Sequence, residues 1–384
     1  MVIVFNGDIM KKYLIFFMSL LIFISVPARV MAEDKEIKVK SSILMCMNTG
    51  DIILEENAYE HMSPASVTKI MSLLLILEAI ESGKITLDDM VAAGENAVSK
   101  GGSQIWLEVG EQMSVNDLLK AVIIASANDA CTLLGEYVAG SDSAFVDMMN
   151  NKVKELGLSN SHFENCTGLD DETTNHYSCA YDLAVIATEV MKYDLITKYS
   201  TVWLDSLRNG ETELNNTNKL VNKYNGITGL KTGTTSIAGF CLCATAQREG
   251  LKLVSVVLGA DTSDDRFNKS TQLLDYGFAN YKIEKLSADE SKLTPVKVKN
   301  GMVKEIVPHI EDGSEVLAPK SSAEFEYEYN IKNEIKAPVK SGDSLGEILV
   351  KCDGKIISKI NLASDRNIEK TDFSSIFMHL LKNI

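Results

Sequence analysis

Three short motifs carry the chemistry of this sequence. They are Ser66-Val67-Thr68-Lys69, Ser126-Ala127-Asn128 and Lys231-Thr232-Gly233, in that order. Taken singly each is weak, because a surface serine, a helix cap and a turn would give the same letters. Taken together they supply a hydroxyl nucleophile, two amines and a side-chain amide, which is a set suited to acyl transfer through a serine.

The first motif predicts a serine activated by a lysine. Residues three apart on a helix share a face, so Ser66 and Lys69 can touch. The almost wholly apolar run from Ile70 to Ile80 predicts a helix buried on all sides, with Ser66 in its first turn. Free lysine has a pKa of about 10.4. Burial and a second cation, for which Lys231 is the candidate, would lower the pKa of Lys69 and make it a base.

The other two motifs predict a proton relay and a binding strand. Ser126 would pass the proton from Lys69 to a leaving amine, and Asn128 would fix Lys69 and hold a substrate amide. Lys231 and Thr232 offer a cation and a hydroxyl to a substrate carboxylate. Gly233 lets an extended ligand approach the strand backbone.

The surrounding pattern predicts two domains. Strands at 41–47 and 52–55 open the chain, and later strands at 229–235, 239–247 and 251–259 precede a helix at 266–281. Helices are expected between these two groups, mainly over 66–156 and 181–191. This order predicts one α+β domain over 38–282, with both groups of strands in one sheet, followed by a small β-rich domain over 290–367.

The motifs and their surroundings resemble the low-molecular-mass penicillin-binding proteins that act as serine-type D-alanyl-D-alanine carboxypeptidases. The resemblance implies their fold, an antiparallel sheet with helices as in serine β-lactamases and penicillin-binding transpeptidases, plus a β-rich C-terminal domain. The matching stretches are Pro64-Ala65-Ser66-Val67-Thr68-Lys69-Ile70-Met71, Gly101-Gly102-Ser103-Gln104, Ser126-Ala127-Asn128-Asp129-Ala130, Gly229-Leu230-Lys231-Thr232-Gly233-Thr234 and Leu274-Asp275-Tyr276-Gly277-Phe278.

The same resemblance implies a role for each residue of the site. Ser66 is the acyl-enzyme nucleophile and Lys69 its general base, while Ser126 and Asn128 complete the relay. The substrate-binding set is Lys231, Thr232, Gly233, Thr234 and Arg266. The backbone N–H groups of Ser66 and Thr234 form the oxyanion hole, and Arg266 lies near the terminal carboxylate. Peptidoglycan pentapeptide stems are the implied substrate, and β-lactams the implied covalent inhibitors.

Three other functions remain open at this point. A β-lactamase of the same fold needs a carboxylate to activate water, and Glu164 is a candidate, although it lacks the Glu-x-x-Leu-Asn pattern. A D,D-endopeptidase would use the same nucleophile. A non-catalytic muropeptide-binding scaffold is disfavoured because all three motifs are intact.

The two ends of the chain suggest export and membrane contact. Lys11 and Lys12 precede an apolar run over 13–26, and Val30-Met31-Ala32 has the form of a signal peptidase site. We expect a signal peptide over 1–32; the alternative, a membrane-spanning helix, needs a longer run. An apolar stripe over 371–384 predicts an amphipathic helix, either a membrane anchor or a helix docked on the β-rich domain.

Composition excludes several other classes of function. The 384 residues include 38 basic and 53 acidic side chains, so the net charge is −15, which disfavours nucleic-acid binding. Five scattered histidines and no Cys-x-x-Cys pair give no support for a metal site, and no cofactor motif is present. The seven cysteines are expected to be mainly buried small side chains, with any disulfide pairing left open.

Overall fold

The computed structural model describes residues 37–371, except 172, 286–288, 311–314, 322–324 and 353. The expected signal peptide and the C-terminal apolar stripe therefore lie outside the described residues. Within the described part, no helix is both long enough and apolar enough to cross a bilayer.

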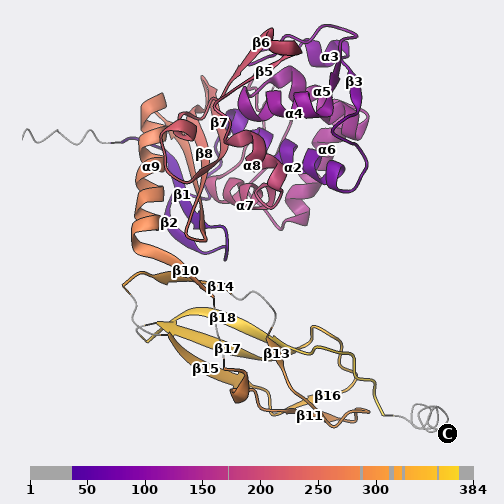
Figure 1. Cartoon of the computed structure of the whole chain (residues 1–384), viewed down its shortest axis with the longest axis vertical. Helices are drawn as coiled ribbons and strands as arrows, with labels where there is room; N and C mark the ends of the chain where they lie inside the picture. The colour runs from indigo at the N-terminus through magenta and orange to yellow at the C-terminus, as the bar shows by residue number, and fades with distance from the viewer. Residues whose placement is uncertain are drawn as a thin grey trace, which may run out of the picture. The chain divides into compact units, whose positions relative to one another are not determined.

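The first domain is built on a five-stranded antiparallel sheet (Figure 1). Its order is β2-β1-β9-β8-β7, with β1 at Ser41–Cys46, β2 at Ile52–Glu56, β7 at Ile227–Thr235, β8 at Gly239–Arg248 and β9 at Leu251–Ala260. The N-terminal hairpin joins the later strands because β1 pairs with β9, with Ile43 opposite Val256. The prediction that both groups of strands share one sheet is confirmed.

Alternate residues of the strands face two separate cores, as the period of two along a strand requires. On β1, Ile43 packs into the core under most of the helices, while Leu44 packs into the core under the long helix α9. In Figure 1, α9 accordingly lies on one side of the sheet and the other helices on the opposite side. The main helices are α2 at Lys69–Glu81, α4 at Val115–Ile124, α5 at Asn128–Ala139, α6 at Asp142–Glu155, α7 at Ala180–Val190 and α9 at Ser263–Asn280.

Helix α2 is buried nearly all round, as its apolar run predicts. Ser66 differs from the prediction, since it lies in a short 3₁₀ turn, η1 (Ala65–Thr68), directly before α2. A 3₁₀ turn has three residues per turn, so residues i and i+3 are eclipsed. The tighter turn therefore aligns Ser66 with Lys69.

Smaller elements complete the domain. The unpredicted ones are α3 at Glu95–Val98, α8 at Asp194–Ser200, η2 at Arg208–Gly210, η3 at Lys219–Asn222, the hairpin of β3 (Met90–Ala92) with β4 (Gln112–Ser114), and the hairpin of β5 (Leu204–Leu207) with β6 (Thr212–Asn215).

The region after α9 is rich in strands, as predicted. Its sheets have the orders β10-β14, β12-β11-β16 and β13-β18-β17-β15. The elements are β10 (Tyr281–Lys285), η4 (Glu290–Lys292), β11 (Val296–Lys299), β12 (Glu305–Ile306), β13 (His309–Ile310), β14 (Glu315–Pro319), β15 (Phe325–Ile331), β16 (Glu334–Lys336), β17 (Ser344–Cys352) and β18 (Lys355–Ala363).

Candidate active site

Ser66 and Lys69 form a hydrogen-bonded pair at the start of α2. The ammonium Nζ of Lys69 donates to Oγ of Ser66 over 2.9 Å. Ala65 turns the chain into η1 with a left-handed φ of 48°. Gly168 packs against this turn so closely that a Cβ there would lie 1.8 Å from the carbonyl oxygen of Ala65. The loop around Gly168 therefore fixes the backbone that presents Ser66.

Lys69 has three hydrogen-bond acceptors and no exposure to solvent. Besides Ser66, its Nζ donates to Oδ1 of Asn128 at 2.5 Å and to the carbonyl oxygen of Thr167 at 2.9 Å. Burial lowers the pKa of Lys69 to about 8 because desolvation disfavours the charged form. A lysine with this pKa can give up its proton near neutral pH, as a general base must.

The second and third motifs meet at a second buried lysine. Nζ of Lys231 donates to Oγ of Ser126 at 2.8 Å and to the carbonyl oxygen of Thr232 at 3.0 Å. Ser126 sits at a left-handed φ of 63° between α4 and α5, which turns its hydroxyl toward Lys231. Burial lowers the pKa of Lys231 well below its ordinary value, and the nearby positive charges of Lys69 and Arg266 lower it further. The expectation that Lys231 lowers the pKa of Lys69 is therefore wrong: burial lowers the pKa of Lys69, and the charge of Lys69 lowers the pKa of Lys231.

The edge strand β7 provides the wall opposite η1. Because β7 pairs with only one strand, its outer backbone groups can pair with an extended ligand. Its inner contact with η1 requires a glycine, since a Cβ on Gly233 would lie 2.8 Å from the carbonyl oxygen of Pro64 and 3.0 Å from the backbone nitrogen of Ser66. Gly233 therefore sets the spacing between Ser66 and the strand, a reason that the sequence did not suggest.

Arg266 lies behind β7, in the first turns of α9, and is only 8% exposed. Its Nη1 donates to the carbonyl oxygen of Gly233 at 2.9 Å, to Oγ1 of Thr234 at 3.0 Å and to the carbonyl oxygen of Cys241 at 3.2 Å. The hydroxyl of Thr234 in turn donates to the carbonyl oxygen of Gly233. Arg266 thus fixes the position of Thr234. Thr232 points its hydroxyl to that of Thr217, 2.7 Å away.

The structure therefore brings all the sequence-predicted site residues to one place, and adds others to which the sequence argument gave no role. The added groups are the carbonyl of Thr167 and the Gly101–Ser103 loop. The side-chain Nδ2 of Asn128 donates to the carbonyl oxygen of Gly101 at 2.7 Å, and its backbone nitrogen donates to that of Ser103. The Gly101-Gly102 pair was visible in the sequence, but a backbone carbonyl carries no residue signature.

Comparisons with known proteins agree with this geometry. Residues 28–262 match the family model described as D-alanyl-D-alanine carboxypeptidase, and 281–370 match the C-terminal domain of penicillin-binding protein 5. The chain is 40% identical over 341 residues to the D-alanyl-D-alanine carboxypeptidase DacF of Bacillus subtilis, covering 88% of this chain and 87% of the relative. The chain belongs to the D-alanyl-D-alanine carboxypeptidase family.

Solved structures extend the likeness to both regions of this carboxypeptidase. Penicillin-binding protein 5 from Haemophilus influenzae aligns with a TM-score of 0.78 and 31% identity, covering 86% of this chain and 98% of that one. Penicillin-binding protein D2 from Listeria monocytogenes, in its cefotaxime-bound form, aligns with a TM-score of 0.57 and 30% identity, covering 62% of this chain and 97% of that one. The predicted fold class and family are confirmed.

The loop that carries Glu164 has a structural role in this carboxypeptidase. The carboxylate Oε2 of Glu164 accepts hydrogen bonds from the backbone nitrogens of Thr174 and Asn175, at 2.8 and 3.0 Å. These two donors lower the pKa of Glu164. The carboxylate is thus engaged in closing its own loop.

All seven cysteines are free thiols buried in the carboxypeptidase. Cys241 and Cys243 point to the same core from alternate positions of β8, as their spacing predicts. Burial raises the pKa of the Cys241 thiol to about 11. Among the described residues, no group of three or more potential ligands is arranged to hold a metal ion.

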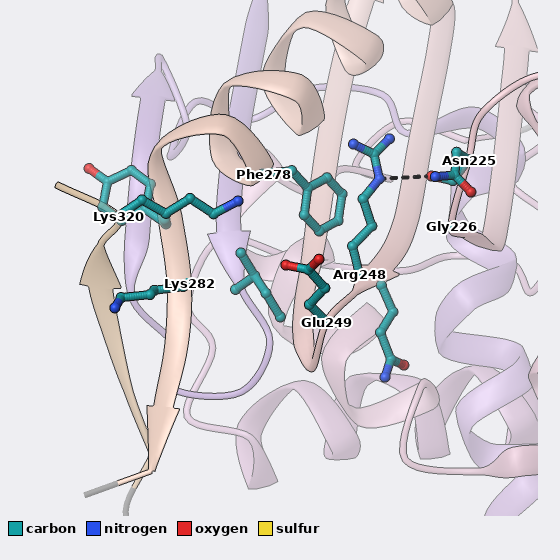
Figure 2. Close-up of a pocket in the computed structure, with 10 residues that line it drawn as sticks. Asn225, Gly226, Arg248, Glu249, Phe278, Lys282 and Lys320 are labelled. Atoms are coloured by element: carbon teal, nitrogen blue, oxygen red, sulfur yellow. Dashed lines mark hydrogen bonds between the residues drawn. The ribbon is translucent and has the colours of Figure 1, made fainter.

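One cavity of this carboxypeptidase lies next to the site around Ser66, and another lies away from it. One, of about 320 Å³, adjoins it and is lined in part by Gly101 and Thr167. The other, of about 410 Å³, is shown in Figure 2 and lies at the far end of β7 and β8, where Arg248 donates to the carbonyl oxygen of Asn225 at 3.0 Å. No residue of the three motifs lines the cavity of Figure 2, so it is separate from the catalytic centre.

Proposed function

We propose that this carboxypeptidase removes the C-terminal D-alanine from peptidoglycan pentapeptide stems through an acyl-enzyme on Ser66. The observation that carries the proposal is the 2.9 Å hydrogen bond between Lys69 and Ser66, made by a lysine whose burial lowers its pKa to about 8. β-Lactams would acylate the same hydroxyl, which accounts for the penicillin-binding character of the relatives.

We assign each part of the acylation step to one of these groups. Neutral Lys69 accepts the proton of Ser66 while Oγ attacks the carbonyl carbon of the penultimate D-alanine. The backbone N–H groups of Ser66 and Thr234 would stabilise the oxyanion, each worth about 2.7–4 kcal/mol in such sites. Lys69 then returns the proton, by way of Ser126, to the nitrogen of the leaving D-alanine. Water then attacks the ester carbonyl and gives a proton, by way of Lys69, to Oγ of Ser66. The ester C–O bond breaks, and the shortened stem leaves with a new terminal carboxyl group.

The free carboxylate of the terminal D-alanine would be bound at β7. Lys231, Thr232 and Thr234 are the groups we assign to it, with Arg266 acting through Thr234. Because desolvating a carboxylate without a cation is costly, the enzyme should cleave a stem with a free C-terminal D-alanine and leave the amidated stem intact. An enzyme that turns over both stems equally would be an endopeptidase rather than a carboxypeptidase.

Arg266 can be tested separately from the lysines. Replacing Arg266 by Ala should lower kcat/KM for the free stem by roughly 1–3 kcal/mol of transition-state binding, the scale of a charge-assisted hydrogen bond. Penicillin acylation should fall in parallel, because a penicillin also presents a carboxylate. A loss for one ligand alone would contradict a shared role.

The nucleophile is tested by fluorescent penicillin labelling. Ser66→Ala should abolish the covalent label while leaving thermal stability nearly unchanged, and Ser82→Ala, at the other end of α2, is the matched control. A label that survives Ser66→Ala would exclude the assignment. A non-catalytic scaffold would take no label, a β-lactamase would lose the label within seconds, and a carboxypeptidase would hold it. We expect the label to be held, because the carboxylate of Glu164 is bonded to its own loop rather than free to activate water.

We also propose how the chain is delivered and divided. Residues 1–32 are a signal peptide, 38–282 the catalytic domain and 290–367 the β-rich domain, and 371–384 anchor the exported enzyme to the membrane surface. The export pattern of the N-terminus and the cell-wall substrate of the family support this scheme. N-terminal sequencing of the secreted protein should begin at Glu33. Deleting 371–384 should release active enzyme into the soluble fraction; continued membrane binding would exclude the anchor.

A further inference from the structure

Trp106 is exposed in a way that packing does not explain. Its side chain is 73% exposed, the highest value for a large apolar side chain among the described residues. Its backbone has a left-handed φ of 53°, a conformation that is costly for a residue with a bulky side chain. An indole normally contributes most when buried, so its presentation to solvent calls for a functional reason.

Two side chains hold the loop around Trp106 through its backbone. The carboxylate of Asp129, 1% exposed, accepts from the backbone nitrogens of Ile105 (3.2 and 3.1 Å) and Leu107 (3.1 Å). In addition, Nη1 of Arg208 donates to the carbonyl oxygen of Ile105 at 2.9 Å. These hydrogen bonds fix the residues that precede and follow Trp106 and leave its ring exposed.

A cavity of about 430 Å³ lies beside this indole. Its rim is polar, with Glu108, Glu111, Arg208 and Thr212. Arg208 is already engaged, because it forms a salt bridge with Glu111 at 2.7 Å and donates to Oγ1 of Thr212 at 2.8 Å. The rim thus offers hydrogen-bond acceptors and a net charge of about −1, which suits a neutral polyhydroxylated ligand and disfavours a phosphate-rich polymer or an anionic membrane surface.

Two adjacent residues link the loop of Trp106 to the site around Ser66. Asn128 accepts from Lys69, while its neighbour Asp129 holds the loop of Trp106. A pentapeptide stem spans at most about 17 Å when extended. The sugar to which the stem is attached must therefore lie within that distance of Ser66, on the protein surface near the cleft.

We propose that Trp106 and the rim of this cavity bind an amino-sugar ring of the glycan strand that carries the stem. The apolar face of the ring stacks on the indole, and its hydroxyls donate to Glu108 and to the free lone pairs of Glu111. The proposal rests on the carboxypeptidase activity, since it concerns how the natural substrate is held. It implies that the enzyme prefers stems still joined to sugar over free peptides.

The first test compares two substrates with the same stem. The ratio of kcat/KM for a disaccharide-pentapeptide to that for the free pentapeptide should exceed one in the unmodified enzyme. Trp106→Ala should lower this ratio roughly tenfold, the scale of a stacking contact with its buried area, and Trp106→Tyr should restore most of it. Val109→Ala is the matched control, because Val109 is 63% exposed on the same loop but does not line the cavity. A ratio that Trp106→Ala leaves unchanged overturns the proposal.

The second test measures binding without any peptide chemistry. The chain has two tryptophans, so Trp203→Phe leaves Trp106 as the only indole. Titration with the peptide-free disaccharide of N-acetylglucosamine and N-acetylmuramic acid, with its lactyl carboxyl amidated so that the ligand is neutral, should change the fluorescence saturably. Glucose phosphate polymers should not. Fluorescence that does not change during the titration refutes the sugar site, even if the enzyme cleaves the stem. An enzyme that binds the disaccharide but does not cleave the stem would contradict only the catalytic assignment. If Trp106→Ala instead dissociates a dimer in light scattering, the indole serves a contact between copies and the proposal is wrong.

Discussion

The lowered pKa of Lys69 makes acylation depend on pH in a defined way. With a pKa of about 8, roughly one lysine in ten is neutral at pH 7, against about one in 2,500 for an ordinary lysine with a pKa of about 10.4. Only the neutral amine can accept the proton of Ser66. The second-order rate constant for penicillin acylation should therefore rise about tenfold between pH 7 and pH 10, with its midpoint near pH 8.

The assay is the rate of labelling by fluorescent penicillin, followed by rapid mixing in buffers from pH 6 to pH 10. Ser66→Ala gives the background, and circular dichroism at each pH confirms that the protein stays folded. A flat profile, or a midpoint near the value of a free lysine, would refute the assignment of Lys69 as a desolvated base.

One substitution should move that midpoint in a known direction. Oδ1 of Asn128 lies 2.5 Å from the ammonium of Lys69. Asn128→Asp places a negative charge there, which stabilises the ammonium and should raise the midpoint by about 1–3 pH units, the usual effect of an adjacent opposite charge. At pH 7 the variant should acylate at least tenfold more slowly, and recovery at high pH would separate this effect from general damage. An unchanged midpoint would mean that Lys69 does not control the profile.

Three further outcomes follow from the packing of the site. Gly168→Ala should destabilise the protein by more than about 3 kcal/mol in chemical denaturation, because its Cβ would overlap the carbonyl oxygen of Ala65. The control Gly140→Ala, also at positive φ but with open space around it, should cost only about 1–2 kcal/mol. Equal losses of stability in the two variants would contradict this account of the loop. The pKa of Lys69 is about 8 in the folded protein and about 10.4 in the unfolded chain, so between these pH values the unfolded chain binds more protons than the native one. The unmodified enzyme should therefore gain about 3 kcal/mol of stability relative to Lys69→Met as the pH rises from 7 to 11. A difference in stability that stays constant with pH in melting experiments would show that the lysine is not desolvated. Ellman's reagent should detect fewer than one thiol in the folded enzyme and all seven after denaturation, because every cysteine is buried; rapid labelling of the native protein would contradict that burial.

The sequence by itself predicted the candidate site residues and most of the elements that carry them. An apolar run from Ile70 to Ile80 is typical of a buried helix, and alternating strands with glycine turns are typical of an antiparallel sheet. These local patterns also predicted that Ser66 and Lys69 would touch, because three residues along one turn fix their separation whatever the rest of the chain does.

The tertiary structure decided how Lys69 is buried, which lowers its pKa, and how the site is spaced. The carbonyl of Thr167 reaches Lys69 from 98 positions along the chain, and any residue could supply such a carbonyl. Gly233 needs to be small because η1 packs on β7, and Arg266 acts on Thr234 from a helix behind the sheet. The exposure of Trp106 likewise depends on Asp129 and Arg208, which both form hydrogen bonds with the backbone of its loop. Such contacts join backbone groups and distant side chains, so only the folded chain specifies them.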